Sequence, residues 1–243
     1  MVWTPGNEFR GAGGRRVPSF IDQRSMPVPF RLKFDGTPDR EELSEAAASL
    51  TKSARRRLER ALAVLNTPGN WISKDVRGYA KRYFLIEEFD EGIANQRVKP
   101  ILEQTWNGLG AASLVVEFKK DVAFLGAVER SPGEAANVTN LEFGGKVVYG
   151  TIQVAQRLVE SRKSQGLAVV TIIHEATHKF AGTWDYCYFE DDGSEARTPS
   201  VRRNEADSYT PVQTDSKKGF TSQNKALQNA DSFAWFAYQI GRK

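Results

Sequence analysis

The chain has 243 residues, of which 40% are hydrophobic and 26% charged. These fractions are ordinary for a globular protein, and no uncharged apolar run reaches the roughly eighteen residues that a transmembrane helix needs. The net charge of +4 is too small to indicate a nucleic-acid partner.

Residues 1–36 are expected to form an irregular N-terminal arm, because glycine and proline recur there too closely for a helix. Residues 37–243 are expected to form one domain. Thr37 and Pro38 fit a helix start, and apolar spacing predicts a first group of three helices. These helices cover about 37–66, 73–84 and 93–106.

Apolar and polar residues then begin to alternate, which indicates strands at 114–118, 122–128, 137–142 and 146–149. A helix with the apolar positions Ile152, Ala155, Leu158 and Val159 is expected to end before Gly166. A second, buried helix follows it. The polar segment 189–221 is expected to be a loop, and Ser222 can cap a last helix that reaches Ile240. We predict an α+β fold, mainly helical, with a small mixed or antiparallel sheet beside the buried helix.

That buried helix carries His-Glu-Ala-Thr-His at 174–178, the pattern H-E-x-x-H, and it contains both histidines of the chain. Side chains four residues apart lie on one helix face, so His174 and His178 can aim two imidazoles at one zinc ion. Glu175 points in another direction and can take a proton from the attacking water. The pattern can arise by chance, but two randomly placed histidines would rarely form it. We predict one zinc ion per chain.

A catalytic zinc needs a third protein ligand, and no third histidine exists. Gly182 lets the chain leave the helix and turn back, which would return Asp185 towards the metal. Cys187 is the alternative ligand, and it would otherwise be a buried apolar side chain. Donor preference and spacing favour Asp185.

The motif and the following Gly-Thr-Trp-Asp-Tyr-Cys-Tyr at 182–188 resemble the aspzincin zinc metallopeptidases, the family of deuterolysin and the peptidyl-Lys metalloendopeptidases. The segment 229–237, Asn-Ala-Asp-Ser-Phe-Ala-Trp-Phe-Ala, resembles a helix near the C-terminus of that family. The resemblance covers residues 145–240 and extends more weakly back to residue 37. It implies a zincin-like metallopeptidase fold.

The resemblance also implies roles for individual residues. The implied zinc ligands are His174, His178 and Asp185, the implied general base is Glu175, and the implied oxyanion donor is Tyr188. Asp231 would lie beside the active centre and orient the water or bind a substrate group; otherwise it would make a buried hydrogen bond. The family's lysine-specific members carry an acidic residue where this chain has Ala234, so lysine preference is not implied.

Our first hypothesis is therefore a zinc-dependent endopeptidase that acts on a protein or peptide. The second is a bacterial toxin or effector metallohydrolase with a narrow protein or peptidoglycan amide substrate, for which an immunity or inhibitor protein would be a partner. The third is a zinc-stabilised binding module without catalysis. We expect no nucleic acid partner and no membrane span.

The N-terminal residues contain no apolar stretch of the kind found in Sec signal peptides. The single cysteine fits a protein that does not depend on disulfides. We therefore expect a bacterial cytoplasmic protein, or one exported by a secretion system that needs no signal peptide.

Overall fold

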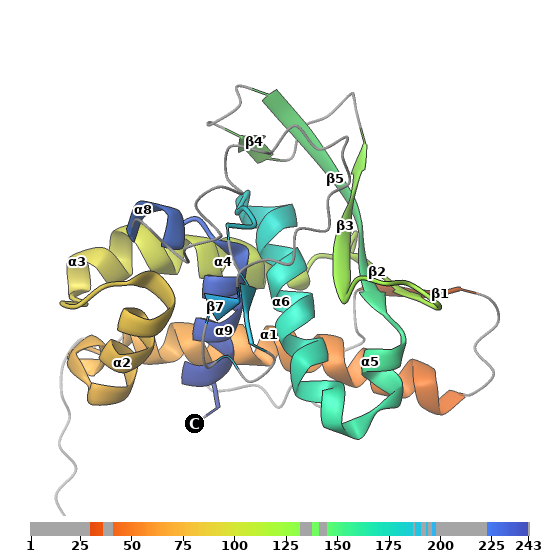
Figure 1. Ribbon diagram of the computed structural model, residues 1–243, viewed down its shortest axis with the longest axis horizontal. Helices are drawn as coiled ribbons and strands as arrows, with labels where there is room; N and C mark the ends of the chain where they lie inside the picture. Colours follow the sequence, from red (N-terminus) through yellow and green to blue (C-terminus); the bar gives the residue numbers. More distant parts are fainter. Residues whose placement is uncertain are drawn as a thin grey trace, which may run out of the picture.

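The computed structural model describes residues 30–35, 41–131, 138–140, 145–186, 188–190, 193, 196–197 and 223–242. Helices form most of this part of the chain, and a small sheet lies beside them (Figure 1). The predicted α+β class, mainly helical with a mixed sheet beside the H-E-x-x-H helix, is confirmed.

The longer helices of the described residues are α1 (Glu41–Asn66), α2 (Lys74–Phe84), α4 (Lys99–Leu109), α6 (Gln165–Ala181) and α9 (Ala230–Ile240). Shorter helical segments connect them: η2 (Asn70–Ile72), α3 (Glu91–Ile93), the π-helical η3 (Ala94–Val98), α5 (Arg157–Glu160), η4 (Arg162–Ser164) and α8 (Gln223–Ala226). The three helices expected in the first part of the domain are present, although the third is divided into α3, η3 and α4. The predicted start at Thr37 and Pro38 lies outside the described residues.

The longest helix, α1, buries one apolar stripe, which includes Ala47, Leu50, Ala54, Leu58 and Leu65. Their spacing of three, four or seven residues keeps them on one face, as the sequence pattern predicts. The next long helix, α2, begins where the Ser73 side chain accepts a hydrogen bond from the Val76 amide. Such an N-cap satisfies one of the amides that a helix start leaves unpaired.

The described strands that belong to the sheet are β1 (Arg31–Phe34), β2 (Val115–Lys119), β3 (Gly126–Ser131), β4 (Val138–Asn140) and β5 (Gly145–Ala155). Their order is β1-β2-β5-β3, and β4 pairs with β5. Pairing is parallel from β1 to β2 and from β2 to β5, and β3 and β4 run antiparallel to β5. A separate pair consists of β6 (Tyr188–Phe189) and β7 (Ala196–Arg197).

Three expected elements are wrong. Residues 152–155 belong to β5 rather than to a helix: their apolar positions fit a helix, but Ile152 and Val154 alternate in burial because β2 and β3 pair on either side. Residues 31–34 form β1 rather than irregular chain, since β2 offers them a parallel partner. Residues 122–125 are not a strand, and the Arg157 guanidinium donates to their carbonyls at Val122 and Phe124.

The expected last helix is divided as well, into α8 and α9, because residues 227–229 leave the helical path. Asn229 has an extended backbone and forms an isolated parallel bridge with Trp184. The predicted cap at Ser222 lies outside the described residues. The break matters for the site, since it lets the chain before α9 pair with the loop that follows α6.

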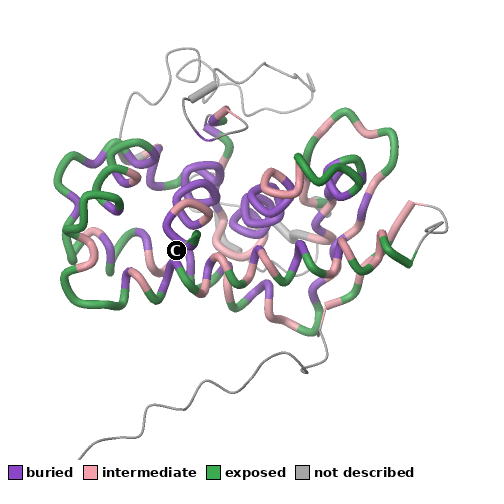
Figure 2. Tube along the Cα trace, turned by 90° about the horizontal axis from the view of Figure 1, so that it is seen from below, coloured by how far each residue is buried: buried purple, intermediate pink, exposed green. Residues whose placement is uncertain are grey.

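The two most completely buried helices are α6 and α9, which pack against each other at the centre of the molecule (Figure 2). On its other sides α6 contacts α1, α4 and the strands β3 and β5. The H-E-x-x-H helix is thus fixed between the helical layer and the sheet. No helix in the described ranges has both the length and the apolar character needed to cross a membrane.

Candidate metal centre

The α6 helix presents its two histidines from the middle of the core. Every residue from Ala168 to His178 is buried, because the apolar run before the motif packs on several sides. The helix ends at Gly182, whose φ of 68° is left-handed, and the Gly182 amide donates to the His178 carbonyl. A residue without a side chain adopts this conformation at little cost, so the chain can turn back over the helix end.

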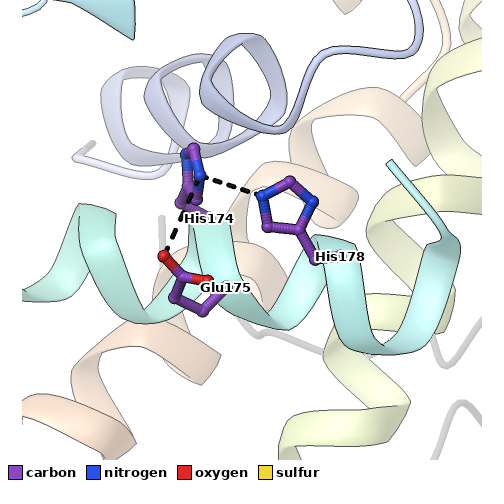
Figure 3. Close-up of side chains that lie close together, drawn as sticks. All are labelled: His174, Glu175 and His178. Atoms are coloured by element: carbon purple, nitrogen blue, oxygen red, sulfur yellow. Dashed lines mark hydrogen bonds and ion pairs between the residues drawn. The ribbon is translucent and has the colours of Figure 1, made fainter. Parts of the chain in front are cut away.

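The two imidazoles point towards each other, and the Glu175 carboxylate points towards His174 (Figure 3). The Nε2 atoms of His174 and His178 are 3.1 Å apart. Such a short approach of two ring nitrogens is unfavourable unless a proton or a cation lies between them or beside them. The spacing of the two nitrogens therefore suits a pair of ligands for one shared ion.

Asp185 completes a triangle of donor atoms. Its Oδ1 lies 3.0 Å from His174 Nε2 and 3.1 Å from His178 Nε2. Three ligands of a tetrahedral zinc at ~2.0 Å would be about 3.3 Å apart, which is close to these separations. The sequence-predicted set of two imidazoles and one carboxylate thus has a spacing that suits zinc.

Both histidines have their other ring nitrogen occupied by an acceptor. His174 Nδ1 lies 3.0 Å from Asp231 Oδ1, and His178 Nδ1 lies 2.7 Å from the Thr183 carbonyl oxygen. A carbonyl can only accept, so His178 Nδ1 donates, and its Nε2 is left with the lone pair that a metal needs. Partners of this kind fix the tautomer and the ring orientation of metal-binding histidines.

Asp231 uses both of its oxygens on protein donors. The first faces His174, and Oδ2 accepts a hydrogen bond of 2.6 Å from the Phe189 amide. Asp231 is buried, with 6% of the residue exposed. This geometry favours a residue that orients a histidine through buried hydrogen bonds, whereas the sequence left three roles open: orienting the water, binding a substrate group or making a buried hydrogen bond.

A backbone connection holds the loop after α6 against the start of α9. The Trp184 amide donates to the Gln228 carbonyl, and the Ala230 amide donates to the Trp184 carbonyl, each at 2.8 Å. The buried Asn229 side chain accepts from the Tyr186 amide at 2.8 Å and donates to Ser232 Oγ at 3.1 Å. Asp185 is therefore flanked on both sides by residues that are bonded to the α8–α9 region.

Two threonines fix the turn between the histidines and this loop. Thr177 Oγ1 donates to the His174 carbonyl at 2.7 Å, and it lies 2.7 Å from Thr183 Oγ1. Both threonine side chains are buried. Asn229, Thr177 and Thr183 support the site without facing the point where the imidazoles converge, and the sequence alone assigned them no individual role. The only signal for them was their position within the two matched motifs.

The charges of the site act strongly on one another. Burial alone would lower the pKa of His174, but the charge of Asp185 and the hydrogen bonds with Asp185 and Asp231 outweigh it and raise this pKa well above its ordinary 6.5. Burial alone would raise the pKa of Asp185, but the charges of His178 and His174 hold it well below its ordinary 3.8. Carboxylates thus favour a positive charge at the point where the imidazoles converge.

Tyr188 stacks on His174, with ring centroids 5.8 Å apart and ring planes 18° apart. Burial of the phenol raises its pKa well above 10, and the carboxylates of Asp185, Glu175 and Asp231 raise it further. The phenol therefore stays protonated and able to donate a hydrogen bond at neutral pH. Tyr188 as a whole is 36% exposed, so the residue lies at the edge of the buried group.

Glu175 lies at the edge of the triangle. His174, Glu175 and His178 form a group of buried side chains that could hold a metal ion, with ligand atoms within 4.8 Å of one another. However, Glu175 Oε1 is 3.9 Å from His174 Nε2, which is 0.9 Å farther than Asp185 Oδ1. The distances favour Asp185 as the third ligand and leave Glu175 beside the ion. Cys187, the alternative ligand, lies outside the described residues.

No family model and no curated protein matches the chain. Among solved structures it is similar to a zinc peptidase from Grifola frondosa, with 15% sequence identity and a TM-score of 0.48. That match covers 82% of this chain and 96% of the other.

Proposed function

We propose that this protein is a zinc-dependent endopeptidase. One observation carries the proposal: two imidazole nitrogens and one carboxylate oxygen lie 3.0–3.1 Å from one another, and a second carboxylate lies next to them. Three ligands leave the fourth position of a tetrahedral zinc to water, which is the pattern of catalytic rather than structural sites. The buried hydrogen-bond acceptors at the other ring nitrogen of each histidine also fit a zinc site.

In this proposal His174, His178 and Asp185 hold the ion. Zinc bound there would supply Lewis acidity for the scissile carbonyl and make water a better nucleophile. Glu175 takes a proton from the attacking water and passes it to the amine that leaves as the peptide bond breaks. The Tyr188 phenol donates to the oxygen that becomes negative during the attack.

Asp231 has a supporting role in this scheme. Its carboxylate accepts from His174 Nδ1, keeps the Nε2 lone pair directed at the ion and makes the imidazole a better ligand. Because its second oxygen is bonded to the Phe189 amide, it can hold His174 and the Tyr188–Phe189 strand in register. We therefore assign Asp231 to positioning.

The decisive experiment is cleavage-site profiling of a proteome-derived peptide library by mass spectrometry. It compares the zinc-loaded wild type with Glu175→Gln and with a chelator-treated sample. Replacing the carboxylate by an amide removes the base and keeps the shape, so we expect turnover to fall about 100- to 10,000-fold with zinc content unchanged.

Cleavage by Glu175→Gln at the wild-type rate, or cleavage that persists in chelator, would contradict the mechanism. If the wild type binds one zinc ion and cuts nothing in the library, the endopeptidase proposal fails. The toxin or effector with a single narrow substrate and the non-catalytic binding module then become the better explanations.

A further inference from the structure

The first residue of β3, Gly126, lies against the side chain of Glu175. A Cβ atom built on Gly126 would be 2.6 Å from Glu175 Oε1 and 2.9 Å from Glu175 Cγ. Real contacts between such atoms are longer, so any side chain at this position would compete with Glu175 for space. The sheet thus meets the α6 helix at the residue that we propose as the general base.

Backbone conformation does not explain the glycine. The described glycines with positive φ are Gly69, Gly182 and Gly193, and Gly126 is not among them. An alanine could adopt the strand conformation of Gly126 without backbone strain. What the position requires is the absence of a side chain.

Neither of the two elements can easily move apart to make room. On the strand side, Gly126 pairs with Val154, and the Ala155 amide donates to the Leu125 carbonyl at 2.8 Å. On the helix side, α6 is buried from Ala168 to His178. The part that can yield is therefore the end of a side chain.

Thr171, one helical turn before Glu175, is the second neighbour. A Cβ on Gly126 would be 2.5 Å from its methyl carbon, Cγ2. The Thr171 hydroxyl donates to the Leu167 carbonyl at 2.9 Å, which fixes the rotamer that directs the methyl group at β3. Gly126 therefore contacts one side chain with only a packing role and one with a proposed chemical role.

We propose that Gly126 is a positioning residue for the proposed peptidase reaction: by lacking a side chain, it leaves the space in which the Glu175 carboxylate is held beside the metal ligands. This inference rests on the proposed function for its effect on turnover. Its structural part, a direct steric coupling between Gly126 and Glu175, does not depend on any substrate.

The first test is Gly126→Ala, assayed on a peptide that the wild type cleaves. The added methyl group displaces the Glu175 carboxylate, and a misplacement of about 1 Å can cost roughly 100-fold in rate. We expect kcat to fall by about that factor, with KM changed much less and zinc still bound at one per chain. The control is Gly78→Ala in α2, where a Cβ meets nothing within 4 Å; it should leave kcat unchanged.

Thr171→Ser separates a positioning role from a general packing defect. Serine lacks the methyl group, so Gly126→Ala combined with Thr171→Ser should regain part of the lost melting temperature and little of the lost kcat. If stability and kcat recover together, or if Gly126→Ala alone keeps the wild-type kcat, Gly126 does not position the base. Loss of zinc from Gly126→Ala would equally overturn the proposal.

A thermal-unfolding cycle tests the contact without any substrate. The effect of Gly126→Ala is measured in the wild type and in a Glu175→Ala background, where one of the two obstructing side chains has been removed. The melting temperature should fall clearly less in the second background, and an equal fall in both would refute the contact. A wild type that cleaves nothing would refute the peptidase proposal, whereas this cycle would still decide whether Gly126 holds Glu175.

Discussion

Asp231 connects two parts of the proposed site through its two carboxylate oxygens. One oxygen accepts from the ring of His174, a proposed metal ligand, and the other accepts from the backbone of the strand that carries Tyr188. Both oxygens of a carboxylate can accept hydrogen bonds, whereas an amide has one oxygen that accepts and one NH₂ group that donates. The role of this residue therefore depends on its being an acid as well as on its shape.

We expect Asp231→Asn to weaken zinc binding by about 10- to 100-fold, the range typical for such hydrogen-bonded partners of a ligand. The asparagine amide can satisfy one of the two donors, but its NH₂ group then faces the other. The measurement is a zinc competition assay with a chromogenic chelator. Asp121→Asn, the same chemical change at an exposed residue, is the control. Unchanged affinity in Asp231→Asn would show that His174 needs no acidic partner.

The convergence of the three proposed ligands could be predicted from sequence because they are close together in the chain. His174, His178 and Asp185 lie within twelve residues, on one helix and the turn after it. Asp231 is 57 residues from His174, so no local pattern shows which of its possible roles it has. Nothing in the sequence around Gly126 predicts its role, because that role depends on the side chains of α6 that a side chain at this position would contact.

At the scale of elements, α6 is fixed at its C-terminal end by close packing on α4. A Cβ on the buried Gly108 would lie 2.1 Å from the nearest ring carbon of Phe180. The two helices can approach this closely because one of them has no side chain at the crossing point. Phe180 follows His178 by two residues, so this contact also supports the end of the helix that carries the ligands.

Gly108→Ala should therefore lower the free energy of unfolding by about 1–3 kcal/mol, the usual cost of adding a methyl group to a full core. Chemical denaturation monitored by circular dichroism measures the change. Gly78→Ala should instead leave stability unchanged or raise it, since alanine favours a helix by up to about 1 kcal/mol over glycine. Equal behaviour of the two variants would mean that α4 and α6 can separate at little cost.

Two of the wrong secondary-structure predictions concern segments whose strand-pairing partners are distant in sequence. Ile152 and Ala155 are three residues apart and fit a helix, yet β2 and β3 pair on both sides of this segment and make it a strand. Likewise, residues 31–34 become a strand only because β2, more than eighty residues later, lies parallel to them. Local periodicity identifies what a segment can bury, and its pairing partner decides the conformation.

For the whole molecule, the fold should persist when zinc is removed. The helices that carry the site bury apolar residues along most of their length, and this burial does not involve the ion. We expect a chelated sample to keep its circular dichroism spectrum and lose its activity. Unfolding on chelation would instead show that the ion is structural.

Zinc should stabilise the protein more as pH rises. The raised pKa of His174 means that, in the chelated protein, its protonated form contributes stability below about pH 6.5. That contribution is lost as pH rises through the raised value. Zinc binds the same nitrogen only when its proton is gone, so zinc affinity, and with it the stabilisation by zinc, grows over this pH range. At a free zinc concentration of 1,000 times Kd, this stabilisation is about 4 kcal/mol. Melting temperatures with and without zinc, from roughly pH 5 to 8, measure the difference; a constant or shrinking difference would contradict the assignment of His174.

The bridge between Trp184 and Asn229 has a consequence for the order of events during synthesis. A nascent chain that ends a few residues beyond α6, after Asp185, already contains both histidines, Glu175 and Asp185. It lacks Asp231, which orients His174, and the backbone of residues 228–230, to which the Trp184 turn is bonded. The ribosome therefore releases the final components of the proposed hydrolytic centre only with α9. Until then, the emerging polypeptide carries the chemical groups for cutting a peptide bond without the framework that aligns them.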